Sequence, residues 1–356
     1  MSLALVIHGA KDLRLEEYAT ETLSSRQVKV QVKAGGICGS DMHYFQHGGF
    51  GTVRVRQPMV LGHEVSGVIT QIGAAVKDLT VGTRISISPS RPCLQCEFCQ
   101  KGLHNHCLNM RFYGSAMPWP HIQGAFRQEM VIDSTQAHPV FDHVSNSQAA
   151  MAEPFSVALH AVARAGSLMG KRVLVTGCGP IGALTVVAAK LAGALEVVVT
   201  DITDQTLQRA KLVGADQVFN TSTTPNALEP FKANKGVFDV MFEASGNQQA
   251  IVAGFEVLKP RGLFIQVGTG GEVTIPLNIL VAKEFDFRGS FRFHEEFAQA
   301  VSLMNQKRVD LTPIISHTVP LNSFLDAFRL AGDRTQSMKV QIDFCEIPAT
   351  KRLSAL

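Results

Sequence analysis

The chain has 356 residues, which is too long for one ordinary core and suits two domains. Hydrophobic residues make up 46% and charged residues 18%, as in well-packed globular proteins, and the formal net charge is only +3. This weak charge, with no basic run, argues against nucleic acid or an anionic membrane as a partner. The opening segment MSLALVIHGAKDLRLEE becomes charged after Ala10, so we expect no signal peptide, no membrane anchor and a cytoplasmic protein.

The first part of the chain carries a series of short strand patterns. Residues 27–34, QVKVQVKA, alternate between polar and apolar side chains, as a half-buried strand does. The segments PMVLG, EVSGVITQIG, TRISISP and QEMVI follow, separated by glycine, proline and aspartate turns. Residues 1–152 are therefore predicted to form a β-rich domain.

A cluster of cysteines lies within this β-rich part, near residues 91–107. The chain has seven cysteines and no evident export signal, which argues against a disulfide framework and favours metal binding. Four of them follow the spacing C-x-x-C-x-x-C-x₇-C: Cys93, Cys96, Cys99 and Cys107. Four thiolates close a tetrahedral zinc shell and leave no position for a substrate, so this zinc is predicted to be structural. The isolated Cys178 and Cys345 are expected to be buried apolar residues.

The pattern changes near residue 153, where short apolar strands begin to alternate with helices. KRVLVT, EVVVTD, QVFN, FDVMFE and GLFIQVG indicate strands, with helical segments such as ALTVVAAKLAGA between them. This alternation predicts an α/β fold with a parallel, doubly wound sheet, a Rossmann domain, over residues 153–289. The closing KVQIDF looks like a strand that returns to the first domain, so residues 290–356 are assigned to that domain.

The first turn of this Rossmann segment, TGCGPIG, is rich in glycine. It carries three glycines in G-x-G-x-x-G spacing: Gly177, Gly179 and Gly182. Asp201 follows nineteen residues later, at the end of the second strand. Such glycines let a pyrophosphate approach a helix N-terminus, and the carboxylate suits adenosine ribose hydroxyls, so we expect NAD, with NADP as the alternative. Asp201 has a second interpretation as a helix N-cap in TDITDQ. Further dinucleotide contacts are expected from three residues: Pro180, Ile181 and Gly268.

A catalytic zinc needs an open coordination position, so it requires a second set of ligands. Three segments offer suitable side chains: Cys38 in GGICGSD, His63 and Glu64 in GHEVSG, and Glu153 in AEP. Taken singly these are ordinary residues, and a His-Glu pair in a β-rich domain is more often a surface pair than a pair of ligands.

Taken together and in this order, these motifs resemble those of the zinc-dependent medium-chain dehydrogenase/reductase family along almost the whole chain. The resemblance implies a GroES-like catalytic domain into which the Rossmann domain is inserted, and two zinc ions per chain. It implies that Cys38, His63 and Glu64 bind the catalytic zinc. Glu153 would be a fourth ligand or would bind a zinc-bound water. Ser40 would relay the substrate's proton, and is otherwise a turn serine.

Within this family the polyol branch looks closest, because a glutamate follows the ligand histidine and AEP stands where other branches carry cysteine. MRFYGSAM, GSFRF and AGDRTQSMKVQ resemble the sugar-acid dehydrogenases of that branch. Animal polyol relatives lack the four-cysteine lobe, which this chain keeps. The expected reaction is oxidation of a secondary alcohol of a small sugar acid or polyol by a homodimer or homotetramer. The alternatives are a threonine-type dehydrogenase and a non-enzymatic nucleotide-binding protein.

Three side chains are candidates for contacting the substrate. Tyr44 can hydrogen-bond a hydroxyl, or can pack as a buried aromatic residue. The resemblance places Arg292 in the substrate cleft, where its guanidinium suits a carboxylate, although polyol enzymes also carry arginine there. Arg111 is a second candidate for an anion contact, or else a surface residue of the zinc lobe.

Overall fold

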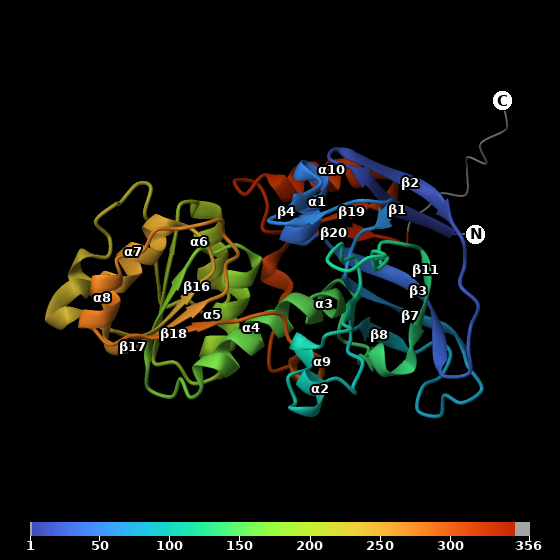
Figure 1. Ribbon diagram of the computed structural model, residues 1–356, viewed down its shortest axis with the longest axis horizontal. Helices are drawn as coiled ribbons and strands as arrows, with labels where there is room; N and C mark the ends of the chain where they lie inside the picture. The colour runs from blue at the N-terminus through green and yellow to red at the C-terminus, as the bar shows by residue number, and fades with distance from the viewer. Residues whose placement is uncertain (1, 346–356) are drawn as a thin grey trace.

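The computed structural model describes residues 2–345, which form two bodies side by side (Figure 1). One body is built mainly from antiparallel strands, and the other from a parallel sheet covered by helices. Two consecutive helices, α3 (Asn146–Ala150) and α4 (Ala152–Ala165), lead from the first body to the second.

The main sheet of the first body has the strand order β12-β8-β7-β3-β20-β19, and β11 also pairs with β3. Its strands are β3 (Gln27–Gly36), β7 (Glu64–Ile72), β8 (Arg84–Ile87), β11 (Glu129–Asp133), β12 (Ala137–Pro139), β19 (Ile315–Pro320) and β20 (Lys339–Asp343). The closing strand β20 runs antiparallel to β3 and parallel to β19. The C-terminal segment therefore returns to the first body, as the sequence predicts.

Smaller elements complete the β-rich body. The remaining strands are β1 (Ser2–Gly9), β2 (Asp12–Tyr18), β4 (Gly49–Phe50), β5 (Val53–Arg54), β6 (Met59–Val60), β9 (Ser90–Arg91) and β10 (Arg111–Phe112). The helices are α1 (Gly39–His47), α2 (Glu97–Gln100) and α10 (Phe324–Gly332). Val28, Val30 and Val32, the apolar positions of the alternating segment in β3, are all buried in one core with residues of β7 and β20.

The second body is a six-stranded parallel sheet with the order β15-β14-β13-β16-β17-β18. Its strands are β13 (Arg172–Thr176), β14 (Glu196–Asp201), β15 (Gln217–Asn220), β16 (Phe238–Glu243), β17 (Leu258–Gln266) and β18 (Asp286–Gly289). Its helices are α5 (Pro180–Leu191), α6 (Asp204–Leu212), α7 (Gln248–Val257) and α8 (Leu277–Ala282), whereas α9 (Glu296–Asn305) lies near α2 and α3 and packs against α4. This is the order of a Rossmann sheet, and it confirms the predicted fold class.

Both faces of the parallel sheet are covered. Val173 and Val175 of β13 belong to a core shared with α4, α5 and α9, whereas Leu174 belongs to a core on the other face with α7. Cys178 is buried in the first of these cores, as predicted. The predicted burial of Cys345 is wrong, because this residue lies beyond the end of β20 and is exposed. Among residues 2–345, no helix combines the length and the apolar character needed to cross a membrane.

Candidate active site

The three predicted ligands of the catalytic zinc meet at the ends of two paired strands. β3 leads into Cys38, which precedes α1, and β7 begins at Glu64, directly after His63. Gly36 pairs with Glu64 across the strands, and a Cβ atom on Gly36 would lie 2.1 Å from Glu64 Oε2. One ligand atom from each of Cys38, His63 and Glu64 lies within 4.8 Å of the other two. The structure therefore brings these three residues together.

This donor set fits zinc in its chemistry and its charge. Zinc accepts a thiolate, an imidazole and a carboxylate, and three protein ligands leave one position open. Burial, reinforced by the charge of Glu64, raises the pKa of the Cys38 thiol to about 11, so its thiolate form needs a nearby cation. Within residues 2–345, the buried Nδ1 atom of His63 has no hydrogen-bond partner. A metal ion would satisfy both groups.

Asp41, which the sequence analysis did not identify, ties the two ligand-bearing loops together. Its buried carboxylate accepts the backbone N–H of Cys38 at 3.0 Å and that of Gly62 at 3.1 Å. Its Oδ1 atom is also 4.0 Å from His63 Nδ1. This distance is too long for a hydrogen bond, so Asp41 acts through the two backbone groups. The spacing of Asp41 three residues after Cys38 is that of a helix capping box, which is a local signal that could have revealed it.

Lys339 is a second residue that the sequence analysis missed. Its Nζ atom, buried in β20, donates to Glu64 Oε1 at 2.7 Å, to Glu64 Oε2 at 2.6 Å and to the carbonyl of Ile37 at 3.1 Å. Glu64 and Lys339 are 275 positions apart, so no local pattern links them. These contacts fix the orientation of the Glu64 carboxylate.

Glu153 lies beside this group but outside it. It is the second residue of α4 and is buried, and this burial raises the pKa of its carboxyl group to about 8. The charge of His63 opposes this shift, whereas those of Glu64 and Cys38 reinforce it. Ser40, in the first turn of α1, places its backbone N–H against the Cys38 sulfur. The proton-handling roles of Glu153 and Ser40 stay predictions.

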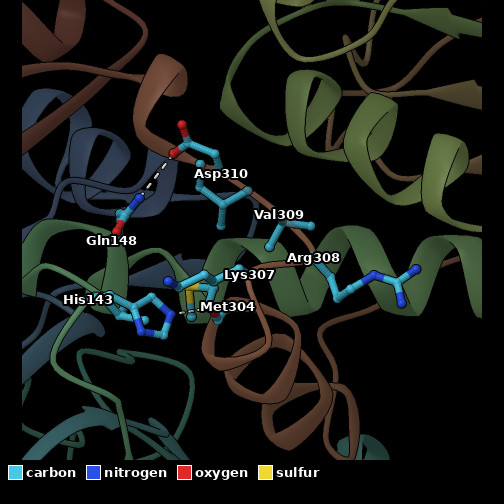
Figure 2. Close-up of a pocket in the computed structure, with 9 residues that line it drawn as sticks. His143, Gln148, Met304, Lys307, Arg308, Val309 and Asp310 are labelled. Atoms are coloured by element: carbon cyan, nitrogen blue, oxygen red, sulfur yellow. Dashed lines mark hydrogen bonds between the residues drawn. The ribbon is translucent and has the colours of Figure 1, made fainter.

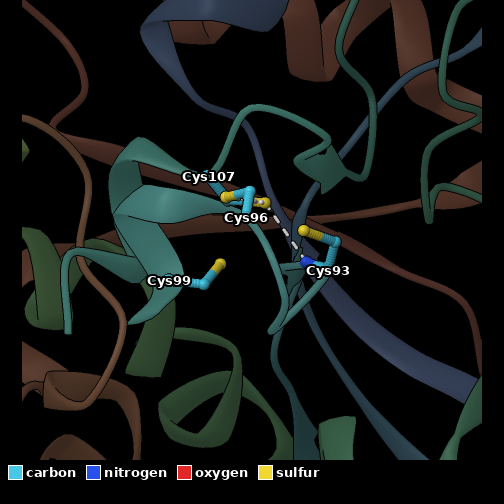
Figure 3. Close-up of side chains that lie close together, drawn as sticks. All are labelled: Cys93, Cys96, Cys99 and Cys107. Atoms are coloured by element: carbon cyan, nitrogen blue, oxygen red, sulfur yellow. Dashed lines mark hydrogen bonds between the residues drawn. The ribbon is translucent and has the colours of Figure 1, made fainter. Parts of the chain in front are cut away.

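The four clustered cysteines form a separate lobe that contains α2 and the 3-10 helix η1 (His104–His106) (Figure 3). Their sulfur atoms all lie within 4.8 Å of one another: Cys93, Cys96, Cys99 and Cys107. The backbone N–H groups of Cys93 and Asn109 donate to Cys107 Sγ at 3.1 and 3.3 Å. Backbone donors, first that of Gln95, lower the pKa of the Cys93 thiol to about 6. Burial has the opposite effect on Cys99 and raises the pKa of its thiol to about 12, so four thiolates in this lobe need a cation among them. The four sulfur atoms lie close enough together for a closed zinc site.

The glycine turn between β13 and α5 has the close backbone approaches that its spacing predicts. Gly177 has a φ of +81°, and a Cβ atom there would lie 2.7 Å from the backbone nitrogen of Ser245. A Cβ atom on Gly182 would lie 2.0 Å from Gly177 O. Gly179 is the N-cap of α5 and Pro180 begins the helix, so Pro180 and Ile181 stand at its positive N-terminus. A phosphate can approach this turn closely.

Asp201 stands next to the glycine turn, but its carboxylate is engaged by backbone groups. Oδ2 accepts the N–H of Cys178 at 2.5 Å, and Oδ1 accepts the N–H groups of Ile202 and Thr203 at 2.7 and 3.0 Å. The structure therefore supports the capping interpretation of Asp201, and its contact with a ribose stays a prediction. Gly268 follows β17, and a Cβ atom there would lie 2.5 Å from the nitrogen of Gly246, so the loops at this sheet edge pack tightly.

Arg292 is held among aromatic side chains near the candidate zinc ligands. Its guanidinium carbon lies 4.3 Å from the ring centre of Phe112 and 5.0 Å from that of Phe291, and Nη2 lies 3.3 Å from Met117 Sδ. Burial lowers the pKa of Arg292, whereas the nearby charge of Glu153 raises it. Arg292 forms no ion pair with any residue that the structure describes. It is therefore a cation available to a ligand.

Tyr44 and Arg111, the other two substrate candidates, differ in their surroundings. Tyr44 is buried beside Phe50, and its hydroxyl accepts the N–H of Ala116 at 3.1 Å. That contact supports the packed interpretation and leaves the hydroxyl proton free for one donation. Arg111 is exposed on β10, which agrees with a surface residue of the lobe.

Hollows in the described part of the chain lie both away from the candidate site and beside it. The hollow in Figure 2 has a volume of about 260 Å³ and lies where α9 ends, between residues such as His143, Gln148 and Asp310. It contains none of the predicted site residues. A second hollow, of about 280 Å³, includes Met117, the residue in contact with Arg292.

Comparisons with known proteins identify the family of this chain. The family model of the alcohol dehydrogenase GroES-like domain matches residues 24–142, and that of zinc-binding dehydrogenase matches residues 180–306. L-idonate 5-dehydrogenase (NAD(P)(+)) of Escherichia coli K12 is 40% identical over 340 residues, covering 95% of this chain and 98% of that protein. Sorbitol dehydrogenase of Bos taurus is 37% identical over 346 residues, 96% of each chain.

A solved structure extends the agreement to three dimensions. The crystal structure of E. coli L-idonate 5-dehydrogenase matches with a TM-score of 0.92 and 39% identity, over 96% of this chain and 98% of that one. The chain thus shares its fold with that enzyme along almost its whole length. The chain therefore belongs to the zinc-dependent alcohol dehydrogenase family, as an oxidoreductase of its polyol and sugar-acid group.

Proposed function

We propose that this enzyme reversibly oxidises the C5 alcohol of L-idonate to the ketone of 5-keto-D-gluconate, with NAD as the preferred acceptor. The observation that carries this choice is the 40% identity to E. coli L-idonate 5-dehydrogenase over 95% of this chain. Arg292, which lies beside Glu153 and Tyr44 and has no ion-pair partner among the described residues, is the proposed carboxylate contact. A sugar acid offers this guanidinium a carboxylate, which a neutral polyol lacks. The second candidate is a sorbitol- or xylitol-type activity, because bovine sorbitol dehydrogenase is almost as similar.

The proposed roles of the residues follow from their positions. Cys38, His63 and Glu64 would hold the zinc ion. When bound, zinc supplies Lewis-acid stabilisation of the alcohol's developing negative charge, and the nicotinamide supplies the hydride acceptor. Glu153, whose pKa of about 8 lies near neutrality, would accept the hydroxyl proton. Ser40 would pass that proton towards solvent.

The remaining proposals concern the whole chain. Gly177, Gly179, Gly182 and Gly268 would face the dinucleotide, with Asp201 at its adenosine ribose. Residues 1–152 and 290–356 would act as the catalytic domain and residues 153–289 as the dinucleotide-binding domain. We also propose a homodimer or homotetramer that acts in the cytoplasm.

A substrate panel tests the proposed function. L-idonate, sorbitol, xylitol and threonine are each offered with NAD and with NADP, and reduced nicotinamide is followed by absorbance. The highest kcat/KM is expected for L-idonate with NAD. A higher kcat/KM for sorbitol or xylitol would favour the second candidate, and activity on threonine alone would overturn both.

Variants of Arg292 test whether this side chain binds the substrate carboxylate. A charge-assisted hydrogen bond to the carboxylate contributes about 1.5–3 kcal/mol, or roughly one to two powers of ten in affinity. Arg292→Ala should lose this contribution, and Arg292→Lys should lose less because it keeps the charge. Both should lower kcat/KM for L-idonate more than for sorbitol. An equal loss for the two substrates would show that Arg292 does not bind the carboxylate.

A further inference from the structure

The second hollow lies next to the proposed substrate position and is lined by two segments, residues 52–56 and residues 116–121. On the side of the second segment, Ala116 donates its N–H to the Tyr44 hydroxyl at 3.1 Å. Met117 places its sulfur 3.3 Å from Arg292 Nη2. One wall of the hollow therefore also borders the substrate candidates Tyr44 and Arg292.

A buried histidine fastens the two walls of this hollow together. His121 is only 5% exposed, and its Nε2 atom accepts the backbone N–H of Arg56 at 2.9 Å. Because Nε2 accepts, Nδ1 carries the proton and donates to Pro118 O at 3.0 Å. On the opposite wall, Arg54 Nη1 donates to the carbonyls of Gly51 and Val53 at 2.7 and 2.8 Å. Both walls are thus held in place by hydrogen bonds.

The lining of the hollow is cationic and aromatic. Arg54 and Arg56 both line it, no carboxylate does, and neither arginine has an ion-pair partner within residues 2–345. Two apolar side chains at its edge are exposed, Met117 at 56% and Trp119 at 61%. Guanidinium groups bind carboxylates, and an indole face packs against the C–H face of a polyhydroxylated chain. The chemistry of the hollow therefore suits a sugar acid.

We propose that this hollow is the subsite for the carboxylate end of the substrate, with Arg54 and Arg56 on one side of Met117 and Arg292 on the other. The proposal rests on the proposed function. In L-idonate the reacting C5 and the C1 carboxylate lie towards opposite ends of the chain. A substrate with C5 at the zinc site would therefore extend its carboxylate away from it, towards the arginines around Met117.

Substitutions of Arg56 test this subsite, because its side chain makes no hydrogen bond needed by either wall among the described residues. Loss of one exposed charge pair should lower the ratio of kcat/KM for L-idonate over that for sorbitol about fivefold in Arg56→Ala. Arg56→Glu should lower it further, because it repels the carboxylate. Arg26→Ala, at an exposed arginine outside the hollow, is the matched control and should keep the wild-type ratio. An unchanged ratio in both Arg56 variants would overturn the subsite while leaving the proposed function intact.

Trp119 gives an independent measurement of binding, because it is the only tryptophan of the chain. L-Idonate added to the zinc-loaded wild type should change the tryptophan emission, and Arg56→Glu should weaken this response at least fivefold. If the wild type oxidises only neutral polyols, the proposed function fails. The kcat/KM ratio then cannot be measured, and the emission titration with L-idonate is the remaining test of the subsite. No emission change with L-idonate would then overturn the subsite too.

Discussion

At the scale of single residues, a buried ion pair with Lys339 holds Glu64, one of the predicted zinc ligands. Both side chains are almost completely inaccessible, and both oxygens of Glu64 accept from Lys339 Nζ. A buried pair is sensitive to the loss of one partner, since the remaining charge is left without compensation. A zinc ion bound by Glu64 would provide part of that compensation.

Lys339→Met should therefore destabilise the metal-free protein by about 3–5 kcal/mol and the zinc-loaded protein by less. Urea unfolding of both forms measures the difference. The control is Lys259→Met, which removes a partly exposed pair with Asp239 and should cost at most about 1 kcal/mol in either form. Equal destabilisation by Lys339→Met with and without zinc would mean that Glu64 does not face the metal.

Asp201 is the residue that we propose sets the preference for NAD over NADP. Its carboxylate lies between the glycine turn and the start of α6, where it would repel an additional 2′-phosphate. Asp201→Ser should bring kcat/KM for NAD and for NADP closer together, mainly by weakening NAD. Because the backbone bonds to Cys178 and Thr203 are also lost, the thermal midpoint of the variant must be compared with that of the wild type. A wild type that uses NADP more efficiently than NAD would refute this role.

At the scale of elements, the cysteine lobe is attached to the segment that carries Arg292. Asn105 Nδ2 donates to Phe291 O at 2.9 Å, and the His106 ring stacks on Phe291 at 5.8 Å. The rings of His104 and His294 lie 4.4 Å apart. The lobe therefore contacts the segment on both sides of Arg292, the proposed substrate contact.

Cys96→Ser should consequently lower the thermal midpoint and the soluble yield, because a closed four-thiolate site contributes folding free energy. Activity should be lost only in proportion to the folded fraction. Thermal unfolding and the specific activity of the folded protein are measured on the same sample. A variant as stable as the wild type but without activity would assign this zinc a catalytic role instead.

At the scale of the whole molecule, the features that could be predicted from sequence are those with a short-range signal. The alternation of polar and apolar side chains predicted β3. The spacing of the cysteines predicted the four-cysteine lobe, and the spacing of the glycines predicted the turn before α5. Cys38, His63 and Glu64, the predicted ligands of the catalytic zinc, each gave only a weak signal in the sequence. Only the order of the motifs along the chain indicated that they belong to one site.

Contacts between distant segments could not be predicted in this way. The ion pair between Lys339 and Glu64 depends on the pairing of β20 with β3, which places the C-terminal strand beside the first ligand loop. The stacking of Arg292 on Phe112 likewise joins the lobe side to the segment after β18. The error at Cys345 arose because an isolated cysteine carries no information about where its strand ends.

The central proposal is that the chain has one open, catalytic zinc site and one closed, structural zinc site. Its most direct test is to measure zinc content and activity on the same samples. The wild type should contain two zinc ions per chain. Cys38→Ser should contain one, lose nearly all turnover and stay folded, because only the open site loses its thiolate and the closed site keeps its zinc. One zinc ion per wild-type chain, or a Cys38→Ser variant with two zinc ions and the wild-type rate, would contradict this account.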